Sequence, residues 1–135
     1  MKVLIAEDDP ASLLLLKAQV RRLGHEVTAV RDGQQAWAAL EKEPHSLVVS
    51  DCMMPEVDGF ELCRRVRALV GVPYTYVILL TAHDSREEYE RGMEAGADDF
   101  LGKPLDGDQL KARLRVAERI LALEREVARL KGASS

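Results

Sequence analysis

Side chains that could do chemistry follow short apolar runs at four places in this sequence. They are Glu7 with Asp8, Asp51, Thr81, and Lys103. Clustered carboxylates repel one another, and ionising all of them is costly unless some are protonated or a cation is close by. Oxygen ligands without cysteine or histidine suit Mg²⁺, which prefers carboxylates together with water and a phosphate. The pattern therefore indicates a magnesium site that handles phosphate, provided that the fold brings these residues together.

Asp51 would have the most reactive role in such a site. A carboxylate can attack phosphorus in line and form an acyl phosphate. Mg²⁺ and Lys103 would neutralise the equatorial oxygens of the phosphoryl group, and the Thr81 hydroxyl would hydrogen-bond one of them. Taken alone, an aspartate after a strand is more often a turn residue or a helix cap than a functional residue, and Lys103 is typical of a surface lysine.

The elements that must position these residues alternate along the chain. The apolar runs predict buried strands at 3–6, 26–30, 47–50, 76–80 and 98–101. Helical patterns follow each run, with Asp9, Ser85 and Asp106 as expected caps and Glu88 completing a capping box with Ser85. This alternation predicts an α/β fold, a single doubly wound domain with a parallel five-stranded sheet of order 2-1-3-4-5. In that order strands one, three, four and five are neighbours, so their carboxyl ends share one edge.

Length and composition exclude several classes of protein. The 135 residues are 47% hydrophobic and 31% charged, which is typical of one globular domain. The net charge of −4 argues against nucleic acid as a direct partner. No apolar stretch approaches the ~20 residues of a membrane span, and a cytoplasmic protein is expected. Cys52 and Cys63 have no metal-binding spacing and are expected to be small buried side chains.

Four segments, taken in order, carry a resemblance to a known family. They are residues 5–9 (IAEDD), residues 50–55 (SDCMMP) with Asp58-Gly59, residues 80–82 (LTA), and residues 95–104 (AGADDFLGKP). Residues 1 to about 120 resemble the receiver domain of a two-component response regulator, with the flavodoxin-like fold of chemotaxis regulators. The resemblance implies that Asp51 accepts a phosphoryl group from the phosphohistidine of a sensor histidine kinase or phosphotransfer protein.

The resemblance also implies a ligand set for the metal. Asp8, Asp51 and the backbone carbonyl of Met53 would bind Mg²⁺ directly, with Mn²⁺ as a substitute, and Glu7 would act mainly through water. Lys103 would bind phosphate, and its bond to the following proline would be cis.

A switch is implied as well. Thr81 and Phe100 would change the face formed by the fourth helix, fifth strand and fifth helix, and so control an effector protein, an output domain or dimerisation. Phe100 stands where the family often has tyrosine. Met53 and His83 stand where relatives vary and where phosphate lifetime is tuned, and an apolar Met53 cannot orient an attacking water.

The last predicted helix, residues 107–131, is longer than docking on a sheet requires. One apolar stripe is assigned to the core: Leu110, Leu114, Ala117 and Leu121. A second stripe has the alternating spacing of a heptad repeat: Val116, Ile120, Leu123, Val127 and Leu130. We expect a receiver domain over 1–120, a helix extension over 121–131 and a disordered tail over 132–135. The extension would form a parallel homodimer seam or lead to an output domain, and a plain surface helix remains the alternative.

Two other functions fit part of the pattern. Phosphatases of the haloacid dehalogenase type also use a strand-end aspartate, Mg²⁺, threonine and lysine, but they need a second acid two residues after the nucleophile, where this chain has Met53. A receiver-shaped scaffold that works without phosphorylation would not need the reactive residues, all of which are present. The leading expectation is a phosphoacceptor signalling protein rather than an enzyme.

Overall fold

The computed structural model describes residues 1–82 and 85–134, in which five strands alternate with five helices. The strands are β1 (Lys2–Ala6), β2 (Glu26–Val30), β3 (Leu47–Asp51), β4 (Tyr76–Thr81) and β5 (Asp99–Gly102). The helices are α1 (Pro10–Arg22), α2 (Gly33–Lys42), α3 (Gly59–Ala68), α4 (Arg86–Ala95) and α5 (Gly107–Ser134). His83, named above for phosphate lifetime, lies outside the described residues.

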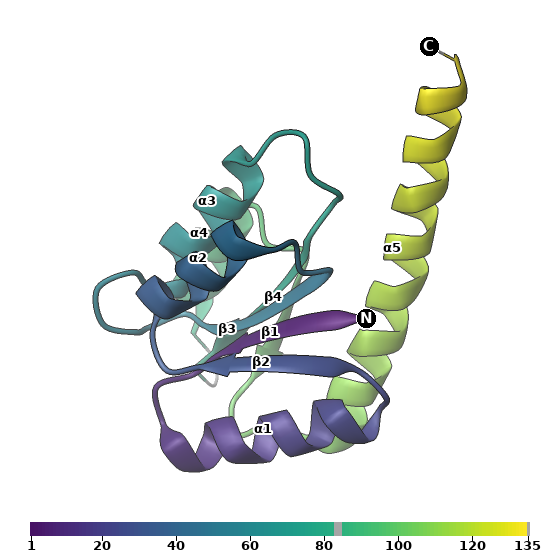
Figure 1. Ribbon diagram of the computed structural model, residues 1–135. Helices are drawn as coiled ribbons and strands as arrows, with labels where there is room; N and C mark the ends of the chain where they lie inside the picture. Colours follow the sequence, from purple (N-terminus) through teal and green to yellow (C-terminus); the bar gives the residue numbers. More distant parts are fainter. Residues whose placement is uncertain (83–84, 135) are drawn as a thin grey trace.

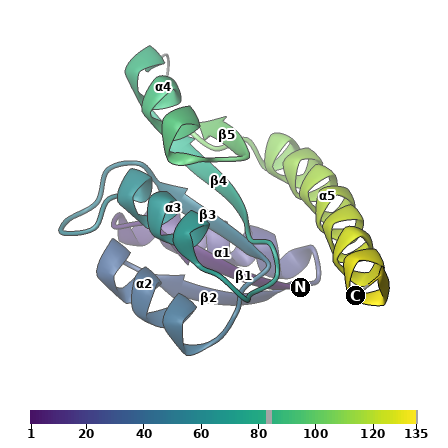
Figure 2. The ribbon, with the colours of Figure 1, turned by 90° about the horizontal axis from the view of Figure 1, so that it is seen from above.

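The strands form one parallel sheet in the order β2-β1-β3-β4-β5, which confirms the predicted topology. Helices α1 and α5 cover one face, and α2, α3 and α4 cover the other (Figures 1 and 2). Alternate strand residues point to opposite faces, so β1 sends Val3 and Ile5 to one core and Leu4 and Ala6 to the other. The near-continuous apolar strands follow from this double covering.

The helix starts use the capping chemistry expected from the sequence. Asp9 accepts the backbone N–H of Ser12, and Ser85 accepts that of Glu88. The second half of the predicted capping box is different, because the Glu88 carboxylate accepts the backbone N–H of Ala82 at 2.8 Å. Glu88 therefore ties the end of β4 to the first turn of α4.

The strand ends differ from the predicted bounds by one residue. Asp51 and Thr81 are the last residues of β3 and β4 rather than the first residues beyond them. Strand β5 begins at Asp99, because the Asp98 carboxylate turns back to accept the backbone N–H of Val77 at 2.8 Å. Asp51 and Thr81 are consequently held by strand geometry rather than by a loop.

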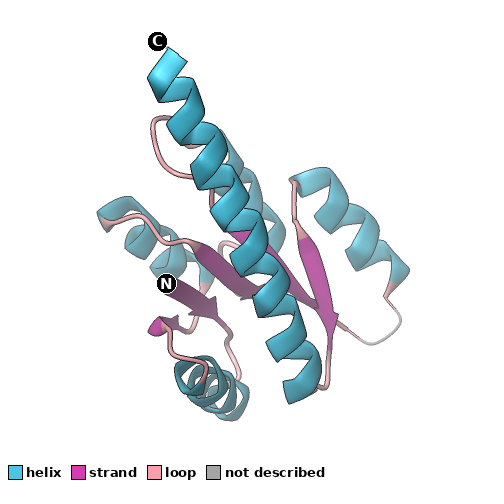
Figure 3. Cartoon of the chain, turned by 90° about the vertical axis from the view of Figure 1, so that its right-hand side faces the viewer, coloured by secondary structure: helices cyan, strands magenta, loops and turns pink. Residues whose placement is uncertain are grey.

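Helix α5 buries the four residues assigned to its core stripe. It runs to Ser134, so three of the four residues expected as a disordered tail are helical. Figure 3 shows its C-terminal half continuing past the sheet. Within the described residues, no helix has the length and apolar character needed to cross a membrane.

Both cysteines are free and buried, as expected. Burial is the main cause that raises the pKa of the Cys63 thiol to about 11. It also raises the pKa of Cys52, which lies directly after Asp51. Both thiols are therefore protonated near neutral pH, which fits a packing role.

Candidate functional site

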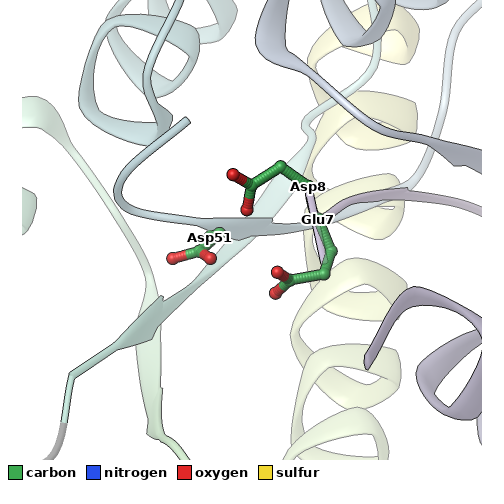
Figure 4. A group of neighbouring side chains, drawn as sticks. All are labelled: Glu7, Asp8 and Asp51. Atoms are coloured by element: carbon green, nitrogen blue, oxygen red, sulfur yellow. The ribbon is translucent and has the colours of Figure 1, made fainter. Parts of the chain in front are cut away.

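The carboxyl ends of β1 and β3 bring three acidic side chains together. Ala6 pairs with Ser50 across these strands, so the residues that follow Ala6 lie beside Asp51. Glu7, Asp8 and Asp51 each place a carboxylate oxygen within 4.8 Å of the others. Figure 4 shows the three side chains beside one another at this edge. The predicted acidic cluster is therefore present in the fold.

Lys103 reaches this cluster from the segment after β5. Its Nζ lies 2.6 Å from Asp51 Oδ2 and 2.7 Å from Glu7 Oε2. Its backbone N–H donates to the carbonyl of Thr81 at 2.9 Å, and its bond to Pro104 is cis. Burial lowers the pKa of Lys103, but the hydrogen bonds and charges of Asp51 and Glu7 outweigh this and leave it above its ordinary value. Lys103 is thus a fixed positive charge beside Asp51.

Glu7 is the buried member of the cluster, with 1% of its surface exposed. Burial raises its pKa above the ordinary value, and Lys103 and the backbone N–H of Asp9 only partly oppose the rise. Its Oε2 forms the ion pair with Lys103 but no well-aligned hydrogen bond with any described residue. A buried oxygen of this kind is the position where a cation or an ordered water is stabilising.

The donor set fits Mg²⁺ better than a softer metal. It consists of three carboxylates, with no cysteine or histidine in the cluster formed by the described residues. Asp8 is exposed and lines an open hollow with Arg31 and Gln35, so solvent reaches the cluster from this side. A hydrated ion can therefore enter and keep part of its water shell.

Thr81 and Phe100, the predicted switch pair, make the contacts described here with residues outside the acidic cluster. Thr81 is buried, and its hydroxyl donates to the carbonyl of Leu101 at 3.5 Å. The Phe100 ring packs against Tyr89, with ring centroids 4.8 Å apart. It also packs over Gly92, where the Cβ of any larger residue would lie 2.4 Å from the ring edge. In this conformation the hydroxyl is hydrogen-bonded to β5 and the ring packs on α4.

Two further residues shape the site without having been singled out for it in the sequence. A Cβ on Gly59 would lie 2.2 Å from the backbone oxygen of Asp51, so only glycine permits this close approach. Glu88 holds Ala82, the residue after Thr81. The turn at Asp58-Gly59 was a signal for the first. No sequence signal pointed to the contact between Glu88 and Ala82, because Ala82 lies before the capping motif of Ser85 and Glu88.

Comparison with known families matches residues 3–115 to the response regulator receiver domain. The chain belongs to this family. Receiver domains are signalling domains of two-component systems rather than enzymes that turn over a substrate. The family match covers every residue of the acidic cluster and Lys103.

Curated relatives of this receiver domain are longer proteins. It is 40% identical over 119 residues to the transcriptional regulatory protein TcrA of Mycobacterium tuberculosis, covering 88% of this chain and 46% of that protein. It is 38% identical over 117 residues to AfsQ1 of Streptomyces coelicolor, covering 87% of this chain and 51% of that protein. The receiver domain thus spans about half the length of these curated relatives.

Solved structures agree with the fold. A response regulator of Chloroflexus aurantiacus superposes with a TM-score of 0.83 at 30% identity, covering 90% of this chain and 97% of that chain. The receiver domain of the Pseudomonas aeruginosa sensor histidine kinase PA1611 gives a TM-score of 0.78 at 31% identity, with the same coverage of 90% and 97%. That structure holds a magnesium ion in its active-site cleft.

Proposed function

We propose that Asp51 is the phosphoacceptor of this receiver domain. The observation that carries the proposal is the position of Lys103, whose Nζ is 2.6 Å from Asp51 and 2.7 Å from Glu7. A cation at this point offsets the repulsion among carboxylates in the unmodified protein. The same cation is within reach of a phosphoryl group added to Asp51.

The chemical step is a transfer between two residues. Asp51 Oδ2 is occupied by Lys103, whereas Oδ1 accepts a long hydrogen bond of 3.4 Å from the backbone N–H of Met53. Oδ1 is therefore the freer oxygen for attack on phosphorus. The new O–P bond forms as the P–N bond to a phosphohistidine breaks, and the electron pair of that bond stays on the imidazole nitrogen.

Asp8 and Asp51, with the backbone carbonyl of Met53, would hold Mg²⁺, and Glu7 would contact it mainly through water. Mn²⁺ offers similar hard-ligand chemistry and would substitute. The bound metal would supply charge neutralisation at the oxygens of the transferring phosphoryl group. Lys103 supplies the second positive charge from the protein itself.

The partners follow from this chemistry. The donor would be the phosphohistidine of a sensor histidine kinase or a phosphotransfer protein. After transfer, the Thr81 hydroxyl would leave Leu101 for a phosphoryl oxygen, and Phe100 would move into the space released. The face formed by α4, β5 and α5 would change shape and control an effector protein or an output domain.

Intact mass after treatment with a small phosphodonor and Mg²⁺ tests the proposal. Wild type should gain one phosphoryl group, and Asp51→Ala should gain none. Asp108→Ala, which alters an exposed aspartate at the start of α5, is the matched control and should gain the group. A chelator should block the gain. An unmodified wild type would favour a scaffold that works without phosphorylation.

A further inference from the structure

The C-terminal half of α5 carries an apolar face that no other described element covers. Leu123, Val127 and Leu130 are 66%, 46% and 53% exposed. Ile120 belongs to the same stripe and packs partly against the core under α1 and α5. These four residues are called the outer seam. Large apolar side chains at regular helical spacing on an exposed face are typical of an interaction surface.

The outer seam lies on a different side of the helix from the core stripe. Leu121 is the last buried residue of that stripe. Beyond it, the core-facing side continues as Glu124, Arg125 and Ala128, which line a groove with the α3–β4 connection at Tyr74. Figures 1 and 3 show this half of α5 extending past the end of the sheet. The outer seam therefore faces away from the receiver domain and is open to a partner.

We propose that the outer seam binds a second copy of this chain, with the two α5 helices parallel. Ile120 and Val127 then occupy a positions, and Leu123 and Leu130 occupy d positions. A β-branched residue at a with leucine at d is the combination that favours two parallel strands. This inference goes beyond the proposed function and does not depend on phosphorylation.

Charges beside the outer seam fit a parallel pair. A residue before an a position meets the residue five places later in the partner helix, so Arg119 faces Glu124 of the second copy. By the same rule Glu126 faces Lys131. Because Glu126 also pairs with Arg129 in its own helix, the Arg119–Glu124 contact carries more of the argument. The surface is thus complementary to itself in this orientation.

The receiver domain stabilises the helix that so short a coiled coil could not form by itself. Two heptads are marginal as free peptides because helix nucleation is unfavourable. In this chain α5 is already helical from Gly107 and is anchored by its buried core stripe. The ordering cost of association is reduced accordingly.

Analytical ultracentrifugation of the 135-residue chain tests the proposal. The sedimenting mass should rise with concentration from 15.0 kDa to twice that value. Leu123→Glu and Val127→Glu should each hold the protein at the monomer mass. Leu14→Glu, at a site 69% exposed on α1, is the matched control and should dimerise like wild type. Circular dichroism should show that all variants are folded.

Charge reversal tests the orientation. Arg119→Glu and Glu124→Arg should each weaken the dimer severalfold, and the double variant should restore it. A wild type that stays monomeric at high concentration, phosphorylated or not, overturns the proposal. A dimer that survives Leu123→Glu would place the contact elsewhere and overturn it too. A double variant no stronger than the single ones would overturn the parallel orientation.

Discussion

Lys103 determines how three carboxylates can share one edge of the sheet. It pairs with both Asp51 and the buried Glu7, whereas Asp8 is exposed and has room for a further cation. A single lysine cannot balance three negative charges, so the site keeps a net negative charge. That residual charge is what makes the cluster attractive to a divalent ion.

Met53 is the residue-scale position at which we expect phosphate lifetime to be set. Its side chain is 56% exposed, and its backbone N–H points to Asp51 Oδ1. An amide at this position can hold a water near the acyl phosphate, whereas a thioether cannot. Met53→Asn should therefore shorten the lifetime of the phosphorylated protein severalfold, as followed by intact mass over time. Met53→Leu is the control, and equal decay of all three proteins would refute this role.

The sequence was sufficient to predict that Glu7, Asp8, Asp51 and Lys103 meet at one edge of the sheet, but not their contacts. Strand order alone brings Asp8, Asp51 and Lys103 to one edge. The bond from Thr81 to Leu101 was not predictable, because a buried hydroxyl selects among nearby carbonyls by its side-chain rotamer. The ion pair between Lys103 and Glu7 also depends on rotamers, so it appears only in the structure.

Arg67 on α3 joins the segment before β4 to the segment before β5 through one guanidinium group. It donates to the carbonyl of Gly96 at 2.8 Å, to that of Thr75 at 2.6 Å and to the Asp98 carboxylate at 2.5 Å. Tyr74 also donates to Asp98. Nothing in the sequence distinguishes Arg67 from the other arginines of α3, because its partners lie at distant positions in the chain.

Removing this guanidinium should be costly. Arg67→Met should lower the free energy of unfolding by about 2–4 kcal/mol, because it removes the positive charge beside the mostly buried Asp98 carboxylate and the guanidinium donor of two carbonyls. Arg64→Met is the control on the same helix, since Arg64 pairs with the exposed Glu61, and should cost at most about 0.5 kcal/mol. Urea denaturation measures both. Equal losses would show that the Arg67 contacts are not stabilising.

Gly59 sets the approach of α3 to the end of β3. A Cβ here would lie 2.2 Å from the Asp51 carbonyl oxygen, and backbone atoms cannot move aside cheaply. Gly59→Ala should lower the free energy of unfolding by about 1–3 kcal/mol. Gly107→Ala is matched, because Gly107 also opens a helix after an aspartate but meets only the flexible end of Gln19. It should change stability by about 0.5 kcal/mol or less, and a similar cost for both would contradict the steric explanation.

At the scale of elements, periodicity and caps predicted every strand and helix that the structure describes. The exceptions lie at the ends. Asp98 lies before its predicted strand, and its carboxylate binds both the backbone N–H of Val77 and the Arg67 guanidinium. Helix α5 passed Gly132 and continued to Ser134, since glycine lowers helix propensity without forbidding a helix.

For the whole molecule, the N-terminal half of α5 is part of the core, whereas its C-terminal half extends beyond the sheet. A chain that ends after Arg125 keeps all four core-stripe residues and should unfold within about 1 kcal/mol of wild type. A chain that ends after Arg113 loses Leu114, Ala117 and Leu121, and buried leucines cost about 2–5 kcal/mol each. It should show no cooperative unfolding transition. Thermal melts followed by circular dichroism distinguish the two, and matching melts would mean that α5 is dispensable to the core.

The short chain between Lys103 and α5 gives the long helix a mechanical property. Gly107 lies four residues after the lysine that holds Asp51, and the helix that begins there has 28 residues. The part of α5 beyond Leu121, the last residue anchored in the core, is about 20 Å long at 1.5 Å per residue, so a tilt of about 5° in the anchored half moves the tip by about 2 Å. For a given tilt, the displacement of the C-terminal end of α5 is thus proportional to the length of its external part. Adding or removing helical turns at the C-terminal end would change this displacement without altering the chemistry at Asp51 and Lys103.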